Sequence, residues 1–146
     1  MKIAIASDHR GYNLKEYLIQ ELSKNYEVLD LGTNSTDSTD FPIYGIKLGE
    51  TIQKNEADFG IAICGTGIGI SIAANKVKGV MCAKISNENE ARLAKEHNNA
   101  NVVALSGDTN PEEALNMITT FLNAEPNTEE KYQRRINQIK EYDNER

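Results

Sequence analysis

Short apolar runs rich in β-forming residues alternate with segments of helical periodicity along most of this chain. The runs lie at residues 2–7, 27–31, 59–64, 79–85 and 101–105. The segments between them, at residues 13–24, near 44–54, 67–76 and 87–96, have apolar residues three and four positions apart. Strands joined by helical crossovers run parallel and are buried on both faces. The alternation therefore predicts a parallel five-stranded sheet with helices on both faces.

Two further helices are predicted after the last strand. Asn110 before Pro111, with two glutamates next, is typical of a helix start, and this helix is expected to reach about residue 123. A second helix is expected from Thr128, with an apolar stripe and a basic pair beside it: Tyr132, Ile136 and Ile139, then Lys131 and Arg135. Because no strand follows, this helix either packs on its own domain or reaches a neighbouring chain.

The composition excludes several classes of protein. With 146 residues, 39% of them hydrophobic, we expect a single domain over residues 1–146. The net charge of -6 argues against nucleic acids and anionic membranes as partners. The amino-terminal residues resemble neither a signal peptide nor a membrane span, so a cytoplasmic location is expected. Cys64 and Cys82 are then free thiols, and no metal-binding spacing is present.

The functional site is expected at the carboxyl ends of the strands, where open parallel sheets bind ligands. Cys64 ends the third run and is followed by Gly65-Thr66-Gly67-Ile68-Gly69 at the start of a helix. Such a turn leaves backbone N–H groups free to bind an oxyanion or a phosphate. It is neither a P-loop nor a dinucleotide fingerprint. A tight turn without chemistry remains the alternative.

Cys64 has two interpretations. A thiol at a strand end facing a helix amino terminus is placed to act as a base or a nucleophile. Alternatively, it is a small buried apolar residue, which is our interpretation of Cys82. Plain structural interpretations also exist for other polar groups: a helix C-cap at residues 97–101, an ordinary turn at Asp8 and His9, and a solvated loop at residues 34–40.

Several segments together resemble one known family. The sequence ICGTGIGISIAANK, residues 63–76, is similar to the signature of type B ribose-5-phosphate isomerases, in the family that includes the galactose-6-phosphate isomerase subunits. Three other segments are similar to that family in order and spacing: SDHRG at residues 7–11, DFP at 40–42 and HNNANV at 97–102. The resemblance covers nearly the whole chain and is weaker after Gly107.

The resemblance implies a Rossmann-like three-layer α/β/α sandwich with an extra C-terminal helix, and a homodimer or tetramer with active sites between subunits. It implies no cofactor and no metal. Cys64 would move the C2 proton, Thr66 and the following amides would stabilise the enediolate, and His97 would open the sugar ring. The implied substrate-binding residues are Asp8, His9, Gly65, Gly67, Ile68, Gly69, Ile70, Asn98, Lys131 and Arg135.

The expected function is therefore the interconversion of ribose 5-phosphate and ribulose 5-phosphate. The alternatives are an isomerase of a hexose 6-phosphate (galactose or allose), or a non-catalytic module that binds an anion or a nucleotide. The chain departs from the family at Phe41 (commonly Tyr), Asp108 (Arg) and Lys131-Tyr132 (Arg-His), mostly at substrate-binding positions. Because Asp108 would repel a phosphate, we expect it to face away or to pair with a cation.

Overall fold

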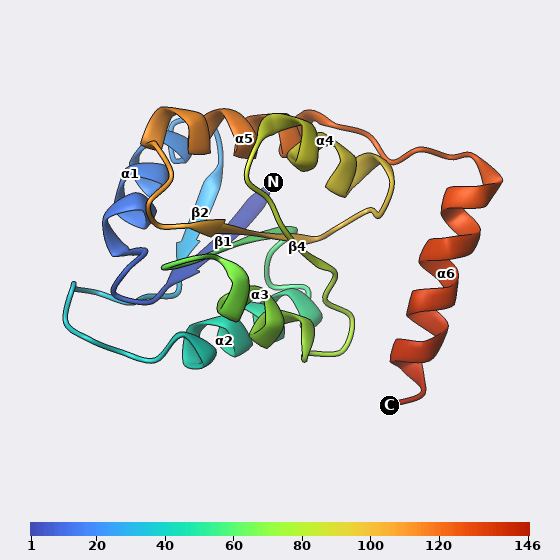
Figure 1. Ribbon diagram of the computed structural model, residues 1–146, viewed down its shortest axis with the longest axis horizontal. Helices are drawn as coiled ribbons and strands as arrows, with labels where there is room; N and C mark the ends of the chain where they lie inside the picture. Colours follow the sequence, from blue (N-terminus) through green and yellow to red (C-terminus); the bar gives the residue numbers. More distant parts are fainter.

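Five parallel strands form one sheet in the order β2-β1-β3-β5-β4 (Figure 1). The computed structural model describes all residues, 1–146. The strands are β1 (Lys2–Ser7), β2 (Glu27–Asp30), β3 (Phe59–Cys64), β4 (Cys82–Lys84) and β5 (Val102–Ser106). The last strand in the chain thus lies inside the sheet, between β3 and β4.

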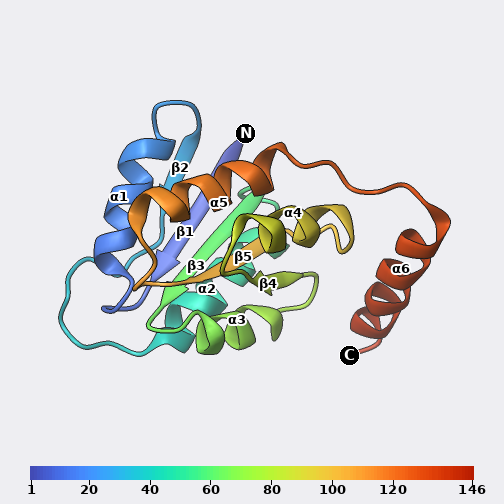
Figure 2. The same cartoon turned by 45° about the horizontal axis from the view of Figure 1, so that its top comes forward.

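Helices cover both faces of the sheet, which confirms the predicted α/β sandwich. One face is covered by α1 (Tyr12–Leu22), α4 (Glu88–Glu96) and α5 (Pro111–Asn123), and the other by α2 (Phe41–Gln53) and α3 (Ile68–Asn75) (Figures 1 and 2). The additional helix α6 (Glu130–Asn144) lies beyond the β4 edge of the sheet. None of the helices combines the length and apolar composition needed to cross a bilayer.

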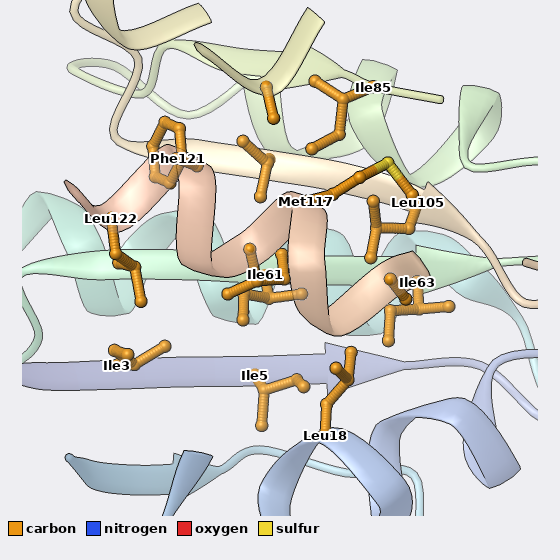
Figure 3. Close-up of a cluster of buried hydrophobic side chains, with 14 of the residues drawn as sticks. Ile3, Ile5, Leu18, Ile61, Ile63, Ile85, Leu105, Met117, Phe121 and Leu122 are labelled. Atoms are coloured by element: carbon orange, nitrogen blue, oxygen red, sulfur yellow. The ribbon is translucent and has the colours of Figure 1, made fainter. Parts of the chain in front are cut away.

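The two faces of the sheet carry side chains of different size. Toward α1 and α5 the central strands present large residues, including Ile5, Ile61 and Leu105, which pack on Met117 and Phe121 (Figure 3). Toward α2 and α3 they present mainly alanines, at positions 4, 6, 62 and 104. Small residues let α2 and α3 approach the sheet closely, and this face ends at the carboxyl edge with Cys64.

The edge strand β4 is shorter than the predicted run at residues 79–85. It has β5 as its only neighbour in the sheet. Before it, the carbonyl of Met81 accepts hydrogen bonds from the N–H groups of Asn101 (3.0 Å) and Val102 (3.2 Å), and side chains add further contacts. Asn101 Oδ1 accepts a hydrogen bond from the N–H of Met81 (2.8 Å), and its amide donates to the carbonyl of Gly79 (3.0 Å). The helix predicted near residues 44–54 begins earlier, at Phe41, with Pro42 in its first turn.

Helix α6 begins at Glu130 and is attached to its own chain near both ends. At its carboxyl end, Asp143 Oδ2 accepts a hydrogen bond from the N–H of Gly79 (2.6 Å), and Arg146 donates to the carbonyl of Asn75 (3.1 Å). Of the predicted apolar stripe only Ile136 is fully buried, whereas Ile139 is 46% exposed. The helix therefore packs on its own chain through a narrow contact and leaves much of its surface free.

Candidate active site

The loops that follow β1, β3 and β5 are joined by hydrogen bonds at the carboxyl edge of the sheet. The N–H of Asp8 donates to the carbonyl of Ile63 (3.2 Å), and the N–H of Gly107 donates to that of Cys64 (2.8 Å). Ser106 Oγ donates to the carbonyl of Gly65 (2.8 Å). These bonds hold the turn after Cys64 between its two neighbouring loops.

The turn itself requires glycine at position 67. Its φ of +80° lies in the left-handed region, and a Cβ there would be 2.8 Å from the carbonyl carbon of Leu105. The sharp reversal starts α3, where the N–H of Ile68 donates to Thr66 Oγ1 (3.1 Å). The N–H groups of Gly69 and Ile70 have no partner within the chain. Free donors at a helix amino terminus attract negative charge.

The Cys64 thiol faces this turn. Its side chain is buried, and the Sγ atom accepts a hydrogen bond from the N–H of Gly67 (3.2 Å). Cys82 lies on the edge strand, where burial raises the pKa of its thiol to about 12. The Cys82 thiol therefore stays protonated at neutral pH and contacts no such turn, in agreement with its interpretation as a small apolar residue.

Asp8 and His9 are both held by backbone groups. Asp8 Oδ1 accepts hydrogen bonds from the N–H groups of Arg10 (2.9 Å) and Gly11 (3.1 Å), so one carboxylate oxygen closes the turn before α1. His9 Nδ1 lies 3.2 Å from both the backbone nitrogen and the carbonyl oxygen of Thr39. These contacts fix the ring and leave Nε2 for another ligand.

The loop at residues 34–40 is therefore more than the solvated segment that its composition indicated. Thr39 contacts His9, and its Oγ1 lies 3.3 Å from the hydroxyl of Tyr44. Hydrogen bonds from Thr33 and Thr39 lower the pKa of Tyr44. Sequence reasoning missed Thr39 and Tyr44, and the only signal near them was the Asp40-Phe41-Pro42 segment.

Two positions that depart from the family pattern border this edge. A Cβ on Gly69 would be 2.6 Å from the ring of Phe41, so that ring covers the start of α3. The carboxylate of Asp108 lies 4.0 Å from the guanidinium of Arg10. Asp108 thus pairs with a cation, which is one of the two arrangements expected for it.

The remaining candidate residues lie at the opposite end of the sheet. His97 and Asn98 follow α4 and precede β5, whereas Cys64 pairs with Ser106 at the end of β5. Lys131 and Arg135 lie on the exposed surface of the first turns of α6. A strand of five residues separates the two groups by roughly 15 Å. A single chain therefore does not bring His97, Asn98, Lys131 and Arg135 to Cys64.

The carboxyl edge is open in one chain. Five surface cavities of about 250 to 450 Å³ are not lined by Cys64, and one of about 320 Å³ lies at the amino edge, next to Phe59, Asn101 and Asp143. No group of three or more His, Cys, Asp or Glu side chains is placed to hold a metal ion. The chemistry available at this edge is therefore that of a buried thiol, free N–H donors, a carboxylate and an imidazole.

Comparison with known proteins assigns the family. Residues 3–139 match the model of a family described as Ribose/Galactose Isomerase. The chain belongs to this family. A probable ribose-5-phosphate isomerase B from Mycoplasma genitalium is 43% identical over 148 positions, which cover 98% of this chain and 96% of the relative.

Solved structures of ribose-5-phosphate isomerase B have the same fold as this member of the ribose/galactose isomerase family. The protein from Clostridium thermocellum has a TM-score of 0.95 and 44% identity, over 99% of both chains. The Mycoplasma genitalium protein with bound ribulose 5-phosphate has a TM-score of 0.94 and 41% identity, over 99% of this chain and 97% of that one. The chain is thus an enzyme, a sugar-phosphate isomerase, which excludes the non-catalytic module.

Proposed function

We propose that this enzyme interconverts ribose 5-phosphate and ribulose 5-phosphate with Cys64 as the base. One observation carries the proposal: the Cys64 thiol and the free N–H groups of Gly69 and Ile70 face the same turn. An aldose-ketose isomerisation needs a base beside a C–H bond and donors for the neighbouring oxyanion. Its substrate is supported by relatives named as isomerases of ribose 5-phosphate, one of them with ribulose 5-phosphate bound.

The reaction moves one proton between carbon atoms and one between oxygen atoms. In the open-chain aldose, Cys64 Sγ takes the proton from C2, and the electron pair of that C–H bond forms the C1–C2 double bond of an enediolate. The negative charge develops on O1, where Thr66 and the free N–H groups stabilise it. Cys64 then returns the proton to C1, while the O2 proton passes to O1 and C2 becomes the carbonyl. No oxidant or cofactor is consumed.

A second copy of the chain completes the site in this proposal. Five large apolar side chains of α2 and α3 are at least 36% exposed although they flank the candidate site: Phe41, Ile43, Ile46, Ile68 and Ile72. Apolar patches of this kind mark protein interfaces. A two-fold dimer over this patch would bring the partner's amino edge to Cys64. His97 would then open the sugar ring, Asp8 and Asn98 would bind hydroxyls, and His9, Lys131 and Arg135 would hold the phosphate.

Asp108 and Phe41 favour a second candidate substrate. The carboxylate of Asp108, paired with Arg10, stands where the family commonly supplies a phosphate-binding arginine, and Phe41 lacks the hydroxyl of the usual tyrosine. Both changes fall at positions where the family pattern implies contact with the substrate. A hexose 6-phosphate is therefore the alternative substrate, still turned over by Cys64.

The test is a steady-state comparison of ribose 5-phosphate, galactose 6-phosphate and allose 6-phosphate with the purified protein. We expect the highest kcat/KM with the pentose phosphate. The Asp108→Arg variant serves as the matched comparison, because it restores the usual family residue and should lower KM for the preferred substrate. No turnover of ribose 5-phosphate would exclude the proposed substrate, and a higher kcat/KM with either hexose would favour the alternative.

A further inference from the structure

An aromatic ring from α6 stacks on His97. The ring centroids of Tyr132 and His97 are 4.5 Å apart, and the ring planes differ by 11°. Both side chains are half-buried, although His97 directly follows α4 and Tyr132 lies on α6, far away in the sequence. The Tyr132 hydroxyl has no hydrogen-bond partner within the chain, so its ring alone makes this contact. Tyr132 is also one of the departures from the family, in which histidine is common at this position.

A single residue joins the two helices beside this stack. The N–H of Asn127 donates to the carbonyl of Glu96, the last residue of α4, at 2.8 Å. Asn127 Oδ1 accepts a hydrogen bond from the N–H of Glu129 (2.8 Å), and the Asn127 carbonyl accepts one from the side chain of Gln133 (2.9 Å). Three hydrogen bonds through one residue therefore fix the first turn of α6 relative to the end of α4.

The first turn of α6 also carries Lys131, which is proposed to bind the phosphate. The Lys131 ammonium lies 5.1 Å from the centroid of the Tyr132 ring, within the range of a cation–π contact. Lys131, Tyr132 and His97 thus form one cluster. The exposed Arg135 lies one helical turn after Lys131.

We propose that Tyr132 is a positioning residue, which fixes the orientation of the His97 imidazole relative to the phosphate-binding residues of α6. This inference rests on the proposed role of His97 in ring opening. A free His97 side chain would rotate about two torsions, and only some orientations direct a ring nitrogen at a sugar oxygen. Stacking restricts those torsions before the substrate binds, and preorganisation of this kind accelerates proton transfer. The distance between Lys131, which binds the phosphate, and His97, which exchanges a proton with the sugar oxygen, is then fixed.

Three variants separate this role from a general structural one. Tyr132→Ala removes the stack, Tyr132→Phe keeps it and removes the unused hydroxyl, and Tyr142→Ala removes a tyrosine of the same helix that is 76% exposed. Proton NMR reports the stack without reference to activity, because His9 and His97 are the only two histidines. The ring current of Tyr132 shifts the His97 resonances upfield, so Tyr132→Ala should move them downfield and the other two variants should leave them in place.

Kinetics then test the effect on catalysis. We expect Tyr132→Ala to lower kcat for ribose 5-phosphate about 10-fold, and Tyr132→Phe to restore it. The readout that a merely structural role would not move is the isotope effect with substrate deuterated at C2. Slower ring opening makes the C2–H step less rate-limiting, so this isotope effect should fall toward one.

Each result has a separate meaning. Unshifted His97 resonances in Tyr132→Ala would show that the stack is absent, whether or not the enzyme accepts ribose 5-phosphate. Full activity in Tyr132→Ala would overturn the positioning role. A loss of activity would also overturn it if the isotope effect is above one and is no smaller than that of the unmodified enzyme. Inactivity of the unmodified enzyme toward ribose 5-phosphate would instead contradict the proposed function and leave the NMR test of the stack intact.

Discussion

Single residues carry the proposed chemistry, and the two cysteines show how strongly position decides reactivity. Cys64 accepts a hydrogen bond from the turn that starts α3, whereas burial raises the pKa of Cys82 to about 12. The Cys64 sulfur thus lies against the backbone donors of a helix start, whereas the Cys82 thiol has no such donor beside it. Because both residues are cysteines of one chain, the same substitution at Cys82 is the control for a substitution at Cys64.

Cys64→Ala should lower kcat by on the order of 100-fold or more, because it removes the acid-base group and leaves the donors in place. The protein should still fold, since alanine fills most of the same space on a face already rich in alanine. Cys82→Ala is the matched control and should keep its activity. The check is kcat with the preferred sugar phosphate, and near-normal turnover in Cys64→Ala would return Cys64 to a purely structural role.

Arg135→Ala should raise KM for the sugar phosphate by about 10- to 100-fold, the usual cost of a lost charge-assisted hydrogen bond. A planar guanidinium binds two phosphate oxygens, so Arg135 should matter more than Lys131. Arg134→Ala is the control on the same helix, since Arg134 pairs with Glu130. An unchanged KM in Arg135→Ala would mean that this side chain lies on a solvated surface.

At the scale of elements, α6 is attached at its carboxyl end by a carboxylate. The N–H of Gly79 and the side chain of Arg146 both donate to Asp143, and these bonds lower the pKa of Asp143. A carboxyl group with a lowered pKa in the folded state stabilises that state above its unfolded pKa of about 3.9. The stabilisation is lost as the pH falls through the folded pKa.

Asp143→Asn should therefore loosen α6 at neutral pH and make less difference in acid. We expect faster amide hydrogen exchange in α6 of this variant at pH 7, and a gap to the unmodified protein that shrinks below about pH 4. Glu141→Gln is the control, because Glu141 is exposed on the same helix and no hydrogen bond engages its side chain. Equal exchange in the Asp143 variant at neutral pH would show that the contact does not hold the helix.

The sequence predicted the individual strands but not the order in which they lie in the sheet. Alternating periodicity predicted all five strands because each strand is a local pattern of burial. It did not predict that β5 lies between β3 and β4, because the length of a connection does not determine beside which strand the next one pairs. The residues after β1 and β3 were found from the strand ends. The contact of Thr39 with His9 and the stack of Tyr132 on His97 were not predicted, because they join segments that are distant in the sequence.

At the scale of the whole molecule, the two groups of candidate residues predict complementation between chains. If each site combines Cys64 of one chain with His97 of another, a hybrid of Cys64→Ala and His97→Ala chains has one intact site and one doubly damaged site. Refolding an equal mixture should give about one quarter of the unmodified activity, because half of the dimers are hybrids with half of their sites intact. Activity no greater than the mean of the separate variants would place the whole site within one chain.

The separation of the two groups by the length of β5 has a genetic consequence. In the proposed dimer, a chain that carries both Cys64→Ala and His97→Ala would damage both sites when it pairs with an unmodified chain. Co-expressed in excess, it should act as a dominant-negative subunit and suppress activity below the level set by the amount of unmodified protein. In the proposed dimer, a substitution in either group therefore also changes a site of the neighbouring subunit, so its effect on activity depends on both chains.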